Sequence, residues 1–125
     1  MLKDISSDAI VAVSDIGRAR TFYRDTLGLD LEHEMDGQVL TFRTGETRLH
    51  VYVSAMAGTN KANAVVWGVG DEIEDIVADL KKKGVSFEHY TDMDGTIDGD
   101  IHVSGAMKTV WFKDPDGNIL HLNNM

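Results

Sequence analysis

The sequence has no cysteine and a single proline. Without cysteine the chain cannot form disulfides or thiolate metal sites, and it has no cysteine nucleophile. This composition is compatible with a reducing cytoplasm, which is the location we expect. The residues at the start, Met1–Asp4, lack the apolar run of a signal peptide. No stretch approaches the ~20 apolar residues of a membrane span, so we expect no membrane partner.

Basic side chains are the minority among the charged residues. The chain has 12 Lys and Arg against 21 Asp and Glu, a net charge of −9. A phosphate-neutralising patch would have to form against this field, so we expect no nucleic-acid partner. A neutral or cationic small molecule, or a metal ion, is easier to accommodate. The sequence also lacks a glycine-rich phosphate loop, a serine nucleophile elbow and an HExxH motif, so nothing favours a nucleotide-binding protein or a hydrolase.

The chain contains an internal repeat. Aligning Asp15 with Asp71 also aligns Gly28 with Gly84. In each copy an apolar segment typical of a strand leads to an aspartate placed as a helix N-cap, and a glycine then ends an amphipathic helix. The 125 residues therefore predict one domain made of two modules, residues 1–58 and 62–125.

Each module is predicted to have the order β-α-β-β-β. Strands are expected at residues 9–14, 29–34, 38–43 and 47–53 in the first module, and at 64–70, 85–89, 107–113 and 118–123 in the second. The second module carries extra residues at 90–106, which predict a long loop or an extended hairpin. One helix leaves a face of each sheet uncovered. The expected fold class is α+β, with two curved mixed sheets around a cleft, a common place for a ligand.

Two motifs carry a resemblance to a known family. They are Val13-Ser14-Asp15-Ile16-x-Arg18-Ala19-x-x-Phe22-Tyr23-x-x-x-Leu27-Gly28-Leu29 and Trp111-Phe112-Lys113-Asp114-Pro115-Asp116-Gly117-Asn118. With the repeat between them, the chain resembles the vicinal oxygen chelate superfamily, which includes glyoxalase I, bleomycin- and fosfomycin-resistance proteins and extradiol dioxygenases. The resemblance implies the fold. It implies less about function, because this superfamily holds enzymes of several classes and binding proteins.

The resemblance also implies where a divalent metal would bind. Enzymatic members use four side chains, one from the start of the first strand and one from the last strand of each half. The four matching positions hold Asp8, His50, Ala64 and His121. Alanine cannot be a ligand, and the usual glutamates are absent. The remaining two histidines and one carboxylate are chemically suited to Zn, Ni, Mn or Fe.

Several other side chains are candidates for contacting a small ligand. His50 alternates with apolar neighbours along its strand, as His121 does, so both histidines are expected on the more polar face. The full set of predicted ligand-binding residues is His50, Tyr52, Trp67, His102, Trp111, His121 and Asn123. His33 and His89 are expected on the apolar side of their strands, as hydrogen-bonded histidines at the edge of the core. The acidic stretch 92–100 lacks the spacing of a calcium-binding loop, and its composition is typical of a solvated loop.

The sequence leaves three functions open. The first is a binding protein of the glyoxalase/bleomycin-resistance type, which holds a small aromatic ligand, neutral or cationic, in the cleft without a metal. The second is a metal-dependent lyase, isomerase or dioxygenase that uses His50, His121 and Asp8 as ligands. The third is an interaction domain whose cleft is filled by side chains. The resemblance also implies a homodimer, in which modules pair within or across chains.

Overall fold

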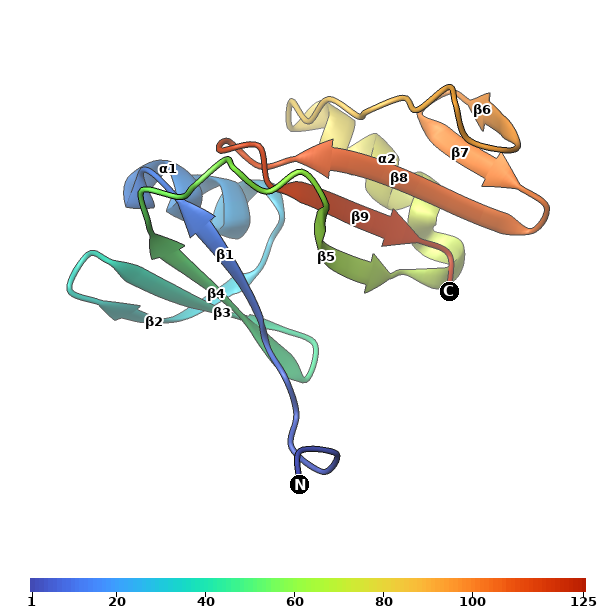
Figure 1. Cartoon of the computed structure of the whole chain (residues 1–125). Coiled ribbons are helices and arrows are strands. Elements are labelled where there is room, and N and C mark those ends of the chain that lie inside the picture. Colours follow the sequence, from blue (N-terminus) through green and yellow to red (C-terminus); the bar gives the residue numbers. More distant parts are fainter. The chain divides into compact units, whose positions relative to one another are not determined.

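The computed structural model describes all residues of the chain, 1–125, and divides it into two compact units. Unit 1 comprises Met1–Lys61 together with Pro115–Asn118, and unit 2 comprises Ala62–Asp114 together with Ile119–Met125. Each unit holds one mixed sheet, so the α+β class with two sheets is confirmed (Figure 1). None of the helices is long and apolar enough to span a lipid bilayer.

The sheet of unit 1, the first sheet, has the strand order β1-β4-β3-β2. Its strands are β1 (Ala9–Val13), β2 (Asp30–Met35), β3 (Val39–Thr44) and β4 (Thr47–Val53). The pairing of β1 with β4 is parallel and the other pairings are antiparallel. These bounds agree with the predicted strands to within a residue or so.

A short helix covers one face of the first sheet. Helix α1 (Ile16–Arg20) continues as a π-helical segment, η1 (Thr21–Thr26). The Asp15 carboxylate caps α1 by accepting from the backbone N–H of Arg18 at 2.9 Å, as predicted. The fully buried Tyr23 ring packs against Phe42 of β3, with ring centroids 5.9 Å apart. The helix therefore shields one face of the sheet, and the other face stays open.

The sheet of unit 2, the second sheet, has the order β5-β9-β8-β7-β6. Its strands are β5 (Asn63–Gly68), β6 (Thr96–Asp98), β7 (Ile101–Ser104), β8 (Met107–Lys113) and β9 (Ile119–Asn123). Helix α2 (Ile73–Lys82) buries Ile73, Val77 and Leu80. An ion pair between Glu74 of α2 and Lys108 identifies the face of the sheet that this helix covers. The hairpin expected within residues 90–106 is formed by β6 and β7.

Two details of unit 2 differ from the prediction. Asp71 does not cap α2: it lies in a 3₁₀ turn (η2, Gly70–Glu72), and the helix begins at Ile73 without a side-chain cap. The strand expected at 85–89 is reduced to a single bridge between Phe87 and Phe112. The physical reason is that β7 pairs with β8 along the same outer edge, at Met107–Thr109, and leaves only the end of that edge for Phe87.

The turn between β8 and β9 belongs to unit 1 although its flanking strands belong to unit 2. The Asp116 carboxylate, only 8% exposed, accepts from the Ser14 backbone N–H at 3.1 Å and from the Ser14 hydroxyl at 2.6 Å. The same oxygen lies 3.3 Å from the Arg18 guanidinium. Asn118 donates to the Ala12 carbonyl of the edge strand β1 at 2.8 Å. The turn thus satisfies polar groups of unit 1 that the first sheet leaves unpaired.

We expect Asp116→Ala to lower the free energy of unfolding by roughly 2–3 kcal/mol. The substitution removes the carboxylate that accepts from the Ser14 backbone, the Ser14 hydroxyl and the Arg18 guanidinium, and it leaves the Ser14 backbone N–H without this acceptor. Urea unfolding followed by circular dichroism measures this change. The control is Asp92→Ala, an exposed loop aspartate, which we expect to change stability by less than about 0.5 kcal/mol. Equal losses in the two variants would show that Asp116 contributes no more than a surface charge.

Candidate functional site

The open face of the first sheet, turned away from α1, is centred on His50. In the register of the sheet, His50 of β4 lies opposite Ile10 of β1 and Thr41 of β3. Paired residues project to the same side of a sheet, so these three side chains share the open face. Tyr52 is on the same face, two residues along β4, opposite Ala12. The predicted site residues His50 and Tyr52 therefore lie together.

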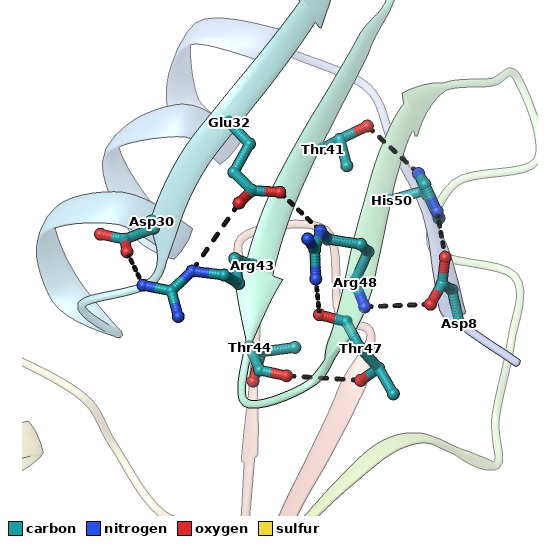
Figure 2. Close-up of polar contacts among 9 residues, drawn as sticks. All are labelled: Asp8, Asp30, Glu32, Thr41, Arg43, Thr44, Thr47, Arg48 and His50. Carbon is teal, nitrogen blue, oxygen red and sulfur yellow. Dashed lines mark hydrogen bonds and ion pairs between the residues drawn. The ribbon is translucent and has the colours of Figure 1, made fainter. Parts of the chain in front are cut away.

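Asp8 holds the imidazole of His50 in place (Figure 2). Its Oδ2 lies 2.9 Å from His50 Nε2, and its Oδ1 accepts from the Arg48 backbone N–H at 3.0 Å. The Thr41 hydroxyl lies 3.2 Å from His50 Nδ1. The hydrogen bonds from His50 and then from Arg48 hold the pKa of Asp8 below its ordinary value. Both nitrogens of His50 are therefore engaged by side chains of unit 1.

A charged network lies beside this pair on the same sheet. Glu32 bridges Arg43 and Arg48, and Arg43 also pairs with Asp30 (Figure 2). These side chains are 37% exposed or more, so the network contributes little to stability. Its effect is on the surface: the two guanidinium groups are neutralised by carboxylates, and no free cationic patch forms at this end of the open face.

The open face of the second sheet is centred on Trp111. In the register of the sheet, Trp111 lies opposite His121, and Thr109 lies opposite both Asn123 and His102. The Trp111 ring meets His102 and His121 edge-on, with centroids 4.9 and 5.1 Å apart, and Tyr90 at 5.2 Å. Trp111 and His102 are each only 8% exposed. Four predicted site residues, His102, Trp111, His121 and Asn123, therefore form one cluster.

The hydrogen bonds around His121 assign its ring proton. The Asn123 Oδ1 accepts from the Met125 backbone N–H, which turns the amide nitrogen of Asn123 toward His121 Nε2 at 3.3 Å. His121 Nε2 therefore accepts this hydrogen bond, and the proton of the neutral ring is on Nδ1. Burial lowers the pKa of His121, so the neutral form is favoured near pH 7. Nδ1 is itself buried and has no hydrogen-bond partner.

A depression of about 310 Å³ lies beside His121, and its walls are otherwise mostly apolar. Asn63, Ala64, Val65 and Val66 of β5 line it with His121. Ala64 is the repeat mate of Asp8, as His121 is of His50. In unit 1 the Asp8 carboxylate occupies the place next to the histidine, whereas in unit 2 the methyl group of Ala64 leaves that place open.

His102 fixes the start of the loop that follows residue 90. The Tyr90 backbone N–H donates to His102 Nε2 at 2.9 Å, so the ring proton of His102 is again on Nδ1. Burial lowers the pKa of His102 and the neighbouring His89 lowers it further, while the Thr109 backbone partly offsets this. His89 itself pairs with Asp100 at 2.8 Å, and Asp100 also binds Lys81. The hydrogen bond from Tyr90 therefore requires a neutral His102.

Comparison with known proteins decides the family. The model of the Glyoxalase/Bleomycin resistance protein/Dioxygenase superfamily matches residues 7–122. The chain belongs to this superfamily. No curated protein sequence matches it. Among solved structures it is similar to a glyoxalase family protein from Enterococcus faecalis, with a TM-score of 0.74 and 21% identity over 98% of this chain and 99% of that one.

Two further structures place the fold among named members of the glyoxalase superfamily. A lactoylglutathione lyase from Agrobacterium tumefaciens has a TM-score of 0.71 at 17% identity, covering 94% of this chain and 91% of its own. A fosfomycin resistance protein from Mesorhizobium loti has a TM-score of 0.68 at 11% identity, covering 96% and 91%. Identities this low show the fold alone.

The glyoxalase superfamily often uses a divalent metal, so the donor set matters. No group of three or more His, Asp or Glu side chains in the structure could hold a metal ion. Asp8 and His50 form a hydrogen-bonded pair, and the second nitrogen of His50 is taken up by Thr41. His121 belongs to unit 2. Within either unit the residues present therefore do not fit a metal centre, and we derive no chemistry through one.

Two predicted placements change in the structure. Trp67 pairs with Leu122, on the face of the second sheet opposite to His121, so it does not join the Trp111 cluster. His33 was expected on the apolar side of its strand, but it pairs with Thr41 on the open face of the first sheet and is exposed. An irregularity between Leu31 and His33 shifts the register of β2 and causes this difference. The expected cleft between the modules stays a prediction.

The two buried histidines predict how stability depends on pH. Above the ordinary histidine pKa of about 6.5, both rings are neutral in the folded and the unfolded chain. Below it the unfolded chain binds protons first, because His102 and His121 have lowered pKa values in the fold. The free energy of unfolding should therefore fall as the pH is lowered through about 6.

Urea unfolding at several pH values measures this dependence. In His102→Gln the amide oxygen can still accept from Tyr90 without titrating, so the dependence should become shallower. His33→Gln, at an exposed position, is the matched control and should keep the slope of the wild type. A stability that rises on acidification in this range would contradict the prediction.

Ala64→Asp should raise the pKa of His121, because a carboxylate at this position is the equivalent of Asp8 beside His50 and favours the charged ring. Titration of the His121 ring protons by NMR measures the shift. Ala64→Asn is the matched control, since it adds the same volume without the charge, and should leave the pKa low. Equal pKa values in the two variants would show that the two units are not equivalent at this position.

Proposed function

We propose that the chain is a small-molecule-binding protein of the glyoxalase/bleomycin-resistance type that needs no metal, and that its ligand contacts the open face of the second sheet at His121. The observation that carries this proposal is that His121, whose buried Nδ1 has no hydrogen-bond partner, lines a depression of about 310 Å³. A buried polar atom without a partner costs about 1–3 kcal/mol, and a ligand that pairs with it recovers part of that free energy.

The lining of the depression indicates the chemistry of the ligand. Ala64 and Val66 offer apolar surface, and exposed apolar side chains in a concavity favour a flat or aliphatic group. His121 carries its proton on Nδ1, so the ligand should present a hydrogen-bond acceptor to it. The acidic balance of the chain favours a neutral or cationic molecule over an anion. An aromatic compound with one acceptor atom meets all three conditions.

The alternative is a metal-dependent lyase, isomerase or dioxygenase with His50 and His121 as ligands. The Asp8–His50 pair supports it in part, since two of the three donors predicted for the metal are adjacent. Ala64 at the fourth position argues against it. Stoichiometric Zn, Ni, Mn or Fe in purified protein, lost in His121→Ala, would favour the alternative over the binding protein.

Quinoline is a suitable probe, because it is flat, neutral at pH 7.5 and has one acceptor nitrogen. We expect it to bind EDTA-treated protein with chemical-shift changes at residues 63–66 and 121, and naphthalene, which lacks the acceptor, to bind more weakly. His121→Ala should weaken quinoline binding about tenfold, or ~1.4 kcal/mol. His33→Ala, the matched control on the first sheet, should have no effect.

Three results would contradict the proposal. One is a requirement for a divalent ion, which would favour the enzyme. The second is equal binding of quinoline and naphthalene, which would remove the role of the His121 N–H. The third is a set of shift changes confined to unit 1.

A further inference from the structure

A second pocket, separate from the depression at His121, lies under the loop that begins at Tyr90. Its volume is about 360 Å³, at the lower end of the range for small-molecule sites. Tyr90, Met93, Asp94, Ile97 and His102 contribute to its lining. It has no lining residue in common with the depression at His121. The pocket is formed by residues 90–102, within the stretch that the second module has and the first lacks.

The charged side chains of the segment that forms this pocket are acidic. No lysine or arginine occurs between Lys83 and Lys108. The acidic side chains Glu88 and Asp100 in that stretch are paired, with Lys113 and with Lys81. Asp94 has no cationic partner and is the only charged side chain in the lining. A cation that enters the pocket would meet an uncompensated carboxylate, whereas an anion would be repelled.

The walls suit an organic cation better than a metal ion. The Tyr90 ring offers an aromatic face that attracts ammonium groups. Met93 and Ile97 provide apolar surface, and methionine adapts its shape to the group that it contacts. A metal ion would need several oxygen or nitrogen ligands, and the structure gathers no such group. The pocket therefore favours a bulky, weakly hydrated cation.

His102 indicates a second property of the ligand, a hydrogen-bond acceptor. It is only 8% exposed and lines the pocket, and its Nδ1 is buried without a hydrogen-bond partner. Its Nε2 already accepts from the Tyr90 backbone, so Nδ1 carries the proton; the Thr109 backbone lies near this ring, but Nδ1 has no hydrogen bond of normal geometry. A ligand with an oxygen atom near its cationic group could supply that acceptor after a small shift of the ring.

We propose that the pocket under residues 90–97 binds a small organic cation that carries a hydroxyl or carbonyl oxygen, with Asp94 facing the cationic group and Tyr90 packing against it. This site is additional to the ligand proposed at His121 and does not depend on it. Trp111 contacts both His102 and His121 but lines neither pocket.

Choline is the probe that tests this proposal, and 3,3-dimethylbutan-1-ol is its neutral counterpart of nearly the same shape. We expect choline to give saturable shift changes at residues 90–97 in NMR titrations of the full chain, and the neutral alcohol to bind at least about tenfold more weakly. Asp94→Asn should weaken choline binding about fivefold or more. Asp92→Asn removes the same charge from the same loop, at a residue that does not line the pocket, and should change it less than about twofold.

Three results of these titrations would contradict the proposal. Absence of saturable choline binding would show that the pocket takes no such cation. Equal binding of the two probes would show that charge is not recognised, and equal effects of Asp92→Asn and Asp94→Asn would show only a diffuse negative field. His121→Ala separates the two sites: it should weaken quinoline binding at the depression about tenfold and leave choline binding unchanged. Either proposal can therefore fail while the other stands.

Discussion

The contact on which unit 1 depends is the carboxylate of Asp116 with the chain around Ser14. One oxygen accepts from the backbone N–H and the hydroxyl of Ser14 and lies next to the Arg18 guanidinium. These donors sit where β1 ends and α1 begins, so the carboxylate fixes the junction between strand and helix. Since charge-assisted hydrogen bonds in a nearly buried position are among the stronger polar contacts, the turn is part of the core structure of unit 1.

This constraint explains why a turn so far along the sequence belongs to unit 1. Asn118 donates to the Ala12 carbonyl on the free edge of β1, where an unpaired backbone group would otherwise remain. Gly58 allows the close approach of the turn, because a Cβ there would lie 2.8 Å from the Asp116 carbonyl oxygen. The motif Asp114–Asn118 therefore acts through its side chains as much as through its shape.

The sequence predicted the parts of the fold that depend on local periodicity. The strands Thr47–Val53 and Met107–Lys113 and the cap of α1 were found where alternation and capping rules placed them. The predictions that were wrong depend on contacts between residues far apart in the sequence. The face of His33 depends on an irregular register in β2, and the strand at 85–89 is lost because β7 competes for the same edge of β8. Period-two alternation cannot reveal either.

The candidate site shows the same limit at the level of single atoms. The sequence indicated that His50 and His121 occupy equivalent positions on polar faces. It could not assign their protons, since these depend on Asp8 and Thr41 in one unit and on Asn123 in the other. The Tyr90 backbone contact that fixes His102 was equally invisible, because backbone donors have no sequence signature.

The residue at one repeat position, Asp8 in unit 1 and Ala64 in unit 2, accounts for the difference between the two histidines. Asp8 gives His50 a carboxylate partner 2.9 Å from Nε2. Ala64 gives His121 none, and burial then keeps the ring neutral. The small side chain of Ala64 also leaves room for the depression beside His121. The position that is equivalent to Asp8 thus forms part of the wall of a mostly apolar pocket in unit 2 and offers no carboxylate to a ligand there.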